Sequence, residues 1–367
     1  MSKPKILFIL HLPPPIHGAA MMGEYIHNSK LINSHFDCQY INLSLAKDLK
    51  DIGKSGLKKF INYIRQIQYI LKMVKSFKPD LCYVTPNAKG GAFYKDFLII
   101  QLLKLFNSKI IVHYHNKGVS IRQNKFIDNI LYKQFFKGIR VILLSESLYS
   151  DVKKYVSKEM VYICPNGIPN NVNNINSRSN NIPKLLFLSN LLVNKGVYTL
   201  LDACKIIKEQ GYNFICNFVG GETTEFNAEK FKKEISIRGL EQHVNYLGRK
   251  TGIEKKECFI NADIFILPTC NECFPLVLIE AMQYQLPCIA SNEGGIPDII
   301  ENGETGFIIK KKDPLMLSEK IIKLIEDSQL RNQMGKKGRE KYLKELTLES
   351  FENNLKSILS DYIRTKD

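Results

Sequence analysis

The chain has 367 residues, of which 44% are hydrophobic and 24% are charged. This length favours two domains, and the balance of apolar and charged residues excludes a disordered protein. No stretch of about 18 uncharged apolar residues occurs, so the sequence predicts no membrane-spanning helix. Nine scattered cysteines, with one isolated C-x-x-C at Cys270 and Cys273, favour a reducing cytoplasm over a disulfide framework or a zinc site.

Charge is distributed unevenly along the sequence. Residues 1–180 contain 26 Lys and Arg against 10 Asp and Glu, whereas residues 181–367 contain 26 of each. The whole net charge of +16 therefore belongs to the first half. This asymmetry predicts that the first half faces an anionic partner, for which a membrane surface, a nucleic acid and a phosphorylated substrate are the candidates.

The first half alternates buried strands with helices. In its opening, MSKPKILFILHLPPP, the apolar run Ile6–Leu10 is too short for a signal peptide, and no cleavage site follows it. This run therefore predicts the first strand of a parallel sheet. The expected strands are residues 5–10, 37–43, 81–85, 110–114, 140–144 and 161–164. Expected helices between them include residues 19–31, 57–77 and 94–106. The alternation predicts a parallel sheet with helices on both faces.

The composition changes at residues 170–183, NNVNNINSRSNNIP, which are polar and Asn-rich as is typical of a linker. Alternation then resumes. The expected strands are residues 184–189, 213–219, 244–247, 262–267 and 287–290, and the expected helices are residues 197–210, 228–239, 275–284 and most of 314–364. We therefore expect one Rossmann-like domain at 1–169, a second at 184–345, and a C-terminal helix at 346–367 that packs back on the first. Two such α/β halves place a ligand-binding cleft between their sheets.

A phosphate-binding pattern follows the first strand of the second half. In LLFLSNLLVNKGVYTLLDA the strand ends near Ser189, and Lys195 with Gly196 opens a helix. The start of a helix offers free N–H groups to an anion, and a lysine there adds a positive charge. The alternative is a solvated lysine in a turn.

Two glutamates eight residues apart form a second pattern, in PTCNECFPLVLIEAMQYQLP. Glu272 falls in a loop, Pro275 in the first turn of a helix, and Glu280 inside that helix. A carboxylate at Glu280 suits a sugar diol; the alternative is a solvated residue, but the helix is apolar on most sides, so this carboxylate needs a partner. The backbone N–H groups available to a phosphate here are those of Phe274, Leu276 and Val277.

A third pattern, SNEGGIPDIIENGETGFII, contains Gly294 and Gly295 directly before another helix. Two adjacent glycines predict a close approach of the backbone that a side chain would prevent. The later NGETG predicts a turn into a strand.

Taken in order, these segments resemble the donor domain of glycosyltransferase family 4, part of glycosyl transferases group 1. The resemblance rests on strand-xNLxxxKG, strand-VGG, NYLG, ADIFILPT, E-x7-E and GGIPDII-NGETGF, and it is densest between Leu185 and Phe307. It implies the GT-B fold, an α/β architecture of two Rossmann-like domains whose parallel sheets face a central cleft. It also implies retaining transfer from a nucleoside diphosphate sugar, with no metal and no other cofactor.

Three residues match the family's functional positions. Glu280 resembles the glutamate that holds the donor ribose, Glu272 the one beside the transferred sugar, and Lys195 the diphosphate-binding lysine. Ser189 and Asn190 stand where the family usually has Gly-Arg, so the arginine that shares the diphosphate charge is absent. Asn190 can bond a phosphate but cannot neutralise it.

A second departure concerns the loop beside the transferred sugar. Cys273 follows Glu272, where the family usually has glycine. Both departures bear on donor affinity and donor identity more than on the fold.

Two loops of the first half resemble the family's acceptor side. PPPIHGAAMMGEYI follows the first strand, and Gly18 permits a close approach where the family often has two glycines. VHYHNKG ends the fourth strand, and His115 resembles the family's active-site histidine near the transferred sugar. His113 lies on the same strand, so one of these two histidines is structural. The alternative for the Gly18 loop is an ordinary strand-to-helix turn, and the alternative for His115 is a histidine of the core.

The segment Lys47–Lys78 carries nine Lys and Arg against two Asp. Its apolar residues at helical spacing are Leu57, Phe60, Ile61, Ile64, Ile67, Leu71 and Val74, and Lys58, Lys59, Arg65 and Lys72 lie off that stripe. We expect the stripe to pack inward and the basic face to meet an anionic membrane surface. No recognition motif for a nucleic acid is present.

The resemblance thus implies hexosyl transfer to a hydroxyl acceptor, which by analogy with the family is a growing bacterial surface glycan or a lipid-linked glycan. The expected enzyme is cytoplasmic and associates peripherally with the inner face of the cell membrane. The alternative from another class is a catalytically silent GT-B binding module at the membrane, which the missing arginine favours. A dinucleotide oxidoreductase is excluded, because no G-x-G-x-x-G follows the first strand.

Overall fold

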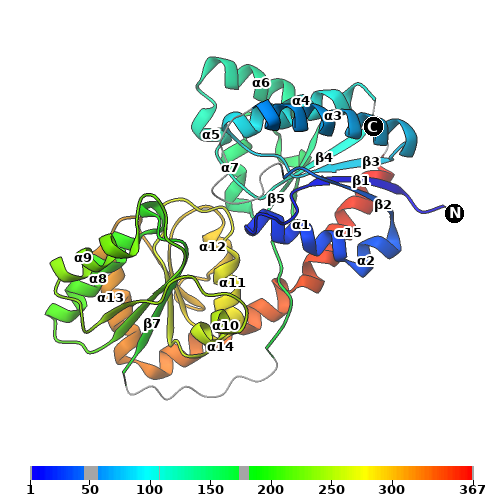
Figure 1. The fold of residues 1–367 in the computed structure, drawn as a ribbon. Coiled ribbons are helices and arrows are strands. Elements are labelled where there is room, and N and C mark those ends of the chain that lie inside the picture. Colours follow the sequence, from blue (N-terminus) through cyan, green and yellow to red (C-terminus); the bar gives the residue numbers. More distant parts are fainter. Residues whose placement is uncertain (1, 45–56, 107, 173–181, 366–367) are drawn as a thin grey trace. The chain divides into compact units, whose positions relative to one another are not determined.

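The structure, a computed structural model, describes residues 2–44, 57–106, 108–172 and 182–365. The chain forms two compact units, one of residues 1–166 with 348–367 and one of residues 167–347. Figure 1 shows both units, each built around its own sheet. Residues 173–181, most of the predicted linker, lie outside the described residues.

The first unit contains a parallel sheet of six strands in the order β2-β1-β3-β4-β5-β6. The strands are β1 (Lys5–Leu10), β2 (Asp37–Asn42), β3 (Leu81–Val84), β4 (Lys109–Tyr114), β5 (Arg140–Leu143) and β6 (Val161–Ile163). Apolar runs such as KILFIL and LCYV are buried almost throughout, because helices cover both faces of a parallel sheet.

The helices of the first unit lie in two layers. They are α1 (Gly18–Asn28), α2 (Lys30–His35), α3 (Leu57–Phe77), α4 (Gly90–Lys104), α5 (Val119–Arg122), α6 (Phe126–Phe136), η2 (Glu146–Leu148), α7 (Tyr149–Val152), η3 (Lys158–Met160) and α15 (Leu348–Arg364). Figure 1 shows α1, α2 and α15 on one face of the sheet and α3, α4 and α6 on the other. Right-handed crossovers require this arrangement, because the chain moves one way from β1 to β2 and the opposite way from β2 to β6.

The C-terminal helix belongs to the first unit although it follows the second in sequence. Its apolar face, which includes Phe351, Leu355 and Leu359, is buried. Two polar contacts tie it to β6: the Tyr162 hydroxyl donates to Asp361 at 2.8 Å, and the side chain of Asn354 donates to the Ile163 carbonyl at 3.2 Å.

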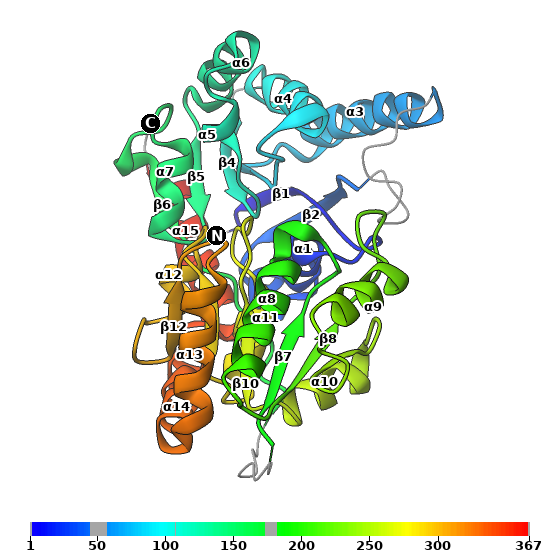
Figure 2. The same ribbon diagram turned by 90° about the vertical axis from the view of Figure 1, so that its left-hand side faces the viewer.

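The second unit contains a second parallel sheet of six strands, in the order β12-β11-β10-β7-β8-β9. Its elements are β7 (Lys184–Leu188), η4 (Val193–Lys195), α8 (Val197–Glu209), β8 (Ile215–Val219), α9 (Ala228–Ile237), β9 (Val244–Tyr246), α10 (Gly252–Ile260), β10 (Ile264–Leu267), α11 (Leu276–Gln283), β11 (Cys288–Ser291), α12 (Ile296–Ile299), β12 (Gly306–Ile309), α13 (Pro314–Glu326) and α14 (Ser328–Glu345). Helices α8, α9 and α13 lie on one face of this sheet, and α10 and α11 lie on the other (Figures 1 and 2).

Two expectations about helices were wrong in detail. The helix expected at 19–31 is two helices, because the Ser29 side chain accepts the Ile32 N–H at 3.1 Å and starts α2. On α3, Ile61 and Ile64 are exposed, while Tyr63 and Ile70 are buried, so the expected apolar stripe does not pack inward as a whole. The segment that precedes α3, residues 45–56, and the side chains of residues 57–60 lie outside the described residues. Among the described helices, none is both long and apolar enough to cross a bilayer.

Candidate active site

Three loops meet at the carboxyl edge of the second sheet. They follow β7, β10 and β11, which are neighbours in the sheet and run parallel. This edge is where open α/β sheets usually bind ligands. Every residue of the second half that the sequence predicted to bind the donor lies in these loops or on α11, which follows one of them.

Backbone contacts hold the three loops together. Gly196 has a φ of +87°, and a Cβ there would lie 2.0 Å from the Pro268 carbonyl oxygen. Gly294 has a φ of +55°, and a Cβ there would lie 2.3 Å from the Glu272 carbonyl oxygen. Both positions therefore require glycine. At Gly294 this is the close approach of the backbone that the sequence predicted. The Cys270 N–H donates to the Asn194 carbonyl at 2.7 Å, which links the first loop to the second.

Lys195 and Glu272 form an ion pair between the β7 and β10 loops. Both side chains are only partly exposed, at 20% and 17%. Lys195 is the last residue of η4, two residues before the start of α8, and Glu272 stands in the loop before α11. The pair therefore places a cation and a carboxylate side by side near the first turn of two helices, where free N–H groups favour an anion.

Helix α11 begins one residue later than predicted, so Pro275 is its N-cap rather than its first helical residue. Leu276 and Val277 are the first two helical residues, and their N–H groups have no acceptor within the helix. Phe274 packs its ring into the core. Only the backbone of this residue is thus left for a ligand.

Glu280 has the partner that its apolar helix requires. Its carboxylate accepts a bond from Lys255 of α10 at 2.7 Å, and both side chains are about a quarter to a third exposed. The alternative of a purely solvated Glu280 is therefore wrong. Lys255 was missed from the sequence, because α10, GIEKKECFI, carries no clear apolar stripe and was not expected as a helix.

A third carboxylate supports the Glu272 loop. Glu293, in the loop after β11, is buried and pairs with Lys311, while its other oxygen accepts the Glu272 N–H at 3.4 Å. The sequence signal that could have found it is a glutamate directly before the Gly294-Gly295 pair. Together, Lys195, Lys255 and Lys311 balance three glutamates, so a bound diphosphate would have to share these cations.

Asn190 and its neighbours have structural contacts of their own. The Asn190 side-chain oxygen accepts the Gly221 N–H at 3.1 Å, and the Ser189 N–H donates to the Val219 carbonyl at 2.9 Å. Asn190 therefore fastens the VGG turn to the end of β7. Cys270 and Cys273 lie in the β10 loop, where both are partly exposed and neither forms a disulfide.

In the first unit, four histidines gather at the carboxyl edge of its sheet. The His113 and His115 rings lie 4.2 Å apart, and those of His11 and His17 lie 6.0 Å apart. His113 is buried and its Nδ1 lies 2.6 Å from the Tyr83 hydroxyl, so His113 is the structural member of the predicted pair. His115 follows β4 directly, and both of its ring nitrogens are buried without a hydrogen-bond partner among the described residues.

Burial keeps these histidines neutral. It lowers the pKa of His115 to about 3, helped by the nearby His11, and the pKa of His11 to about 4, helped by His17. At neutral pH His115 is therefore an uncharged imidazole that can donate or accept a hydrogen bond but cannot supply a positive charge.

Gly18 is the first residue of α1, whose N-cap His17 accepts the Ala20 N–H at 3.3 Å. A Cβ on Gly18 would meet nothing within 4 Å, so the packing of the unit itself does not require glycine there. Gly23, one turn further along α1, is the glycine that packing requires, because a Cβ there would lie 2.0 Å from the His11 carbonyl oxygen.

The neutral histidines predict acid sensitivity. Their folded pKa values lie below the unfolded value of about 6.5, so the unfolded chain takes up protons first. The stabilisation is complete above about pH 6.5 and is lost as the pH falls toward 4 for His11 and toward 3 for His115. The slope is at most about 1.4 kcal/mol per pH unit for each histidine. Denaturant unfolding of the whole chain at pH 7.5 and pH 5 measures this loss.

The buried Asp96 changes the stability in the opposite direction as the pH falls. Burial raises its pKa to about 6, so the folded chain takes up this proton before the unfolded chain does. The contribution of the histidines is therefore measured by comparing the loss of stability in single variants with the loss in the unmodified chain. His11→Gln should lose less stability between pH 7.5 and pH 5 than the unmodified chain does. Gln134→Ala, which removes an exposed side chain of the same unit that does not titrate, should match the unmodified chain. An equal loss in all three proteins would contradict the assignment.

The fold and the second-unit site define the class of protein. The structure aligns with Alr3699/HepE of Anabaena in complex with UDP at a TM-score of 0.76 and 16% identity, covering 98% of this chain and 100% of that one. The chain therefore has the GT-B fold, as predicted. Residues 171–341 match the family described as glycosyl transferases group 1.

Curated relatives agree with this match. The capsular polysaccharide biosynthesis glycosyltransferase CapM of Staphylococcus aureus is 30% identical over 49% of this chain and 47% of its own length. An uncharacterized glycosyltransferase of Methanocaldococcus jannaschii is 28% identical over 90% of this chain and 92% of its own length. The chain spans about half or less of the length of the first curated relatives it matches. Among the described residues, no group of His, Cys, Asp or Glu could hold a metal ion.

Proposed function

We propose that the chain is a retaining, metal-independent glycosyltransferase that moves a hexosyl unit from a nucleoside diphosphate sugar to a hydroxyl acceptor. The observation that carries the proposal is the Lys195–Glu272 pair, held by three interlocked loops beside the first turns of α8 and α11. The match of residues 171–341 to glycosyl transferases group 1 supports it, as does the fold shared with a structure that contains UDP.

Each residue has a role in the proposed reaction. Lys195 and the N–H groups at the start of α8 and α11 stabilise the negative charge that develops on the leaving diphosphate. Glu280 accepts the ribose hydroxyls, and Glu272 lies beside the transferred sugar. His115 and Gly18 belong to the first unit, where the neutral His115 imidazole bonds a sugar hydroxyl and Gly18 admits a ligand close to the backbone.

The acceptor we propose is a growing bacterial surface polysaccharide or a lipid-linked glycan. The relative from Staphylococcus aureus acts in capsular polysaccharide biosynthesis, and the first half of this chain carries the whole net charge of +16. We place the enzyme in the cytoplasm, in peripheral contact with the inner face of the cell membrane. A basic surface is attracted to the anionic lipids of that face.

A test of the reaction needs the stereochemistry as well as the product. We expect proton NMR of the purified product to show the anomeric configuration of the donor sugar, with no loss of rate in excess EDTA. Inversion at the anomeric carbon would contradict the retaining mechanism. A rate restored only by added Mg²⁺ or Mn²⁺ would contradict metal independence.

A second candidate is a catalytically silent GT-B module that binds a ligand at the membrane. The observation that favours it is Asn190, which stands in place of the family's arginine and bonds to Gly221. Release of nucleoside diphosphate from a panel of nucleotide sugars separates the two candidates. Binding of a donor with no release, in the presence and absence of acceptor glycans, would favour the silent module.

A further inference from the structure

The first turn of α6 exposes large apolar side chains to solvent. The helix buries Tyr132, Phe135 and Phe136 against the rest of the first unit. On its opposite side Phe126 is 79% exposed and Ile127 is 65% exposed. A helix on the surface of a domain normally turns a polar face to water, so this second apolar face needs an explanation.

Neighbouring elements extend this surface. Ile130, one turn after Phe126, is exposed, and Ile121 of α5 is 65% exposed. We call Ile121, Phe126, Ile127 and Ile130 the α5–α6 tip. Arg122 of α5 bonds Asp128 of α6 at 2.6 Å, so α5 and α6 are held together at this end. The tip is therefore a fixed apolar feature of the first unit.

The charges around the tip are of one sign. Among the described residues of α3, α4, α5 and α6, the acidic side chains are Asp96 and Asp128, and both are buried. Asp96 accepts the Asn87 N–H, and Asp128 accepts the Tyr94 hydroxyl at 2.6 Å in addition to Arg122. These carboxylates are thus used inside the unit and add no exposed negative charge to the layer.

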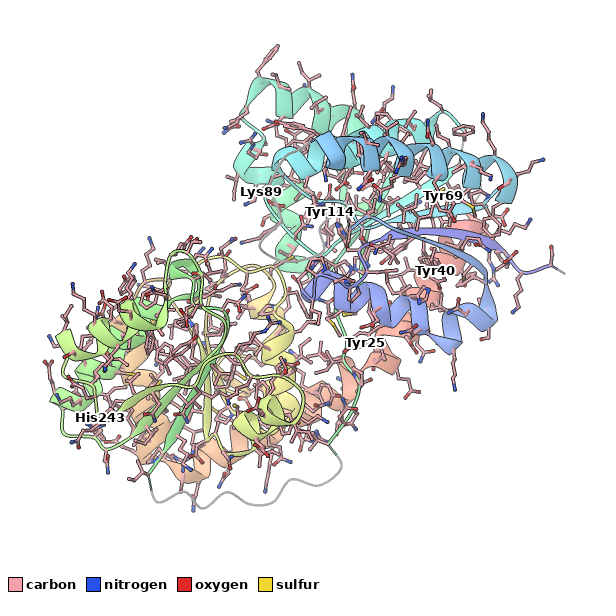
Figure 3. The ribbon with its side chains drawn as sticks, in the orientation of Figure 1. Tyr25, Tyr40, Tyr69, Lys89, Tyr114 and His243 are labelled. Carbon is pink, nitrogen blue, oxygen red and sulfur yellow. The ribbon has the colours of Figure 1, made fainter. Side chains whose placement is uncertain are left out.

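The exposed charges of the same layer are basic. Lys125 and Lys133 flank the tip, Lys95 lies on α4, and Arg65, Lys72 and Lys75 lie on α3. Figure 1 shows α3, α4 and α6 in one layer. Figure 3 labels Tyr69, an exposed aromatic side chain of α3. A shallow hollow on α3 is lined by Lys72, Lys75 and Gln68. The layer therefore combines exposed apolar side chains with positive charge and no exposed negative charge.

We propose that this layer docks on a bilayer of anionic phospholipids, with the α5–α6 tip below the headgroups and the lysines at the lipid phosphates. Apolar insertion and polybasic attraction together bind an amphipathic surface to such a membrane. A soluble polyanion would need the lysines but not the tip, and a protein partner would need no lipid. The inference rests on the proposed membrane location, and it identifies the surface responsible.

The sequence contains no tryptophan, so one introduced tryptophan reports on its own surroundings. We would compare Phe126→Trp with Ile253→Trp, which replaces a 75% exposed residue of α10 in the second unit. With phosphatidylglycerol–phosphatidylcholine vesicles, the emission of Phe126→Trp should shift to the blue and be quenched by brominated acyl chains. The emission of Ile253→Trp should not change. Equal behaviour of the two variants, or no quenching of either, would overturn the proposal.

A second measurement tests the energetic role of the tip. The double variant Phe126→Ser/Ile127→Ser should partition onto the anionic vesicles at least about tenfold more weakly than the unmodified chain, because insertion of apolar side chains is lost. The matched control is Ile237→Ser/Ile253→Ser, which removes two exposed apolar residues of the second unit. Equal partition of both double variants would overturn the proposal, as would a dimer in solution that only the tip variant disrupts.

Donor turnover distinguishes a failure of this inference from a failure of the proposed function. Release of nucleoside diphosphate without vesicles should be the same in the tip variant and the unmodified chain. Normal turnover with no vesicle binding by the unmodified chain would reject the docking surface and leave the proposed activity intact. Normal vesicle binding with no turnover of any donor would reject the proposed activity and leave the docking surface intact.

Discussion

Lys195→Ala should lower the turnover of a nucleotide sugar by roughly 100- to 1,000-fold, the usual effect of removing a preorganised group that stabilises charge in the transition state. The ammonium is held in place by Glu272, and the Lys195 side chain is only 20% exposed. The measurement is the steady-state rate of nucleoside diphosphate release at a saturating donor concentration.

The matched control for Lys195 is Lys205→Ala. Lys205 is an exposed residue of α8 that pairs with Glu209 at 3.7 Å, a contact of the kind that contributes little to stability. Lys208 is less suitable, because it donates to the Gly239 carbonyl at 2.7 Å. Equal rates in the Lys195 and Lys205 variants would show that Lys195 only pairs with Glu272, and would remove the diphosphate assignment.

Glu280→Gln should weaken donor binding by roughly 10- to 100-fold and leave the chain folded, since the loss of one charge-assisted hydrogen bond costs about 1.5–3 kcal/mol. The reason is the placement of Glu280 on α11, directly after the loop that carries Glu272. Calorimetric titration with the preferred donor measures the affinity, and thermal unfolding measures stability.

Two further variants separate ligand binding from ion pairing. Glu254→Gln removes a glutamate that pairs with Lys250 at 2.9 Å on the same unit, and it should leave the affinity unchanged. Lys255→Gln removes the partner of Glu280 but keeps the carboxylate. If Glu280 acts only as that partner, Glu280→Gln and Lys255→Gln will lower stability alike and neither will change donor affinity.

Most of the fold could be predicted from the sequence, because strands of a parallel sheet are buried on both faces and appear as continuous apolar runs. KILFIL and IFIL are such runs, and they became β1 and β10 at or near the expected bounds. Helix α10, GIEKKECFI, has no clear apolar stripe and was not expected. The break at Ser29 depends on a side-chain cap inside a continuous helical pattern, which periodicity alone does not reveal.

The site was only partly predictable. Lys195 and Glu272 were each singled out as ligands, but they are 77 residues apart, and their pairing depends on β7 lying beside β10. Strand order follows from tertiary packing and not from local periodicity. The two glycines that follow Glu293 dominate the sequence signal of its motif, so its buried carboxylate and its contact with the Glu272 backbone were not predicted.

The most direct test of the central claim is the release of nucleoside diphosphate from a panel of nucleotide sugars, measured with the unmodified chain and with the double variant Lys195→Ala/Glu280→Gln. We predict that the unmodified chain turns over at least one donor and that the double variant, still folded by thermal unfolding, loses nearly all of that activity. Turnover of the same donor at an equal rate by both proteins would contradict the assignment of the donor site to this edge of the second sheet.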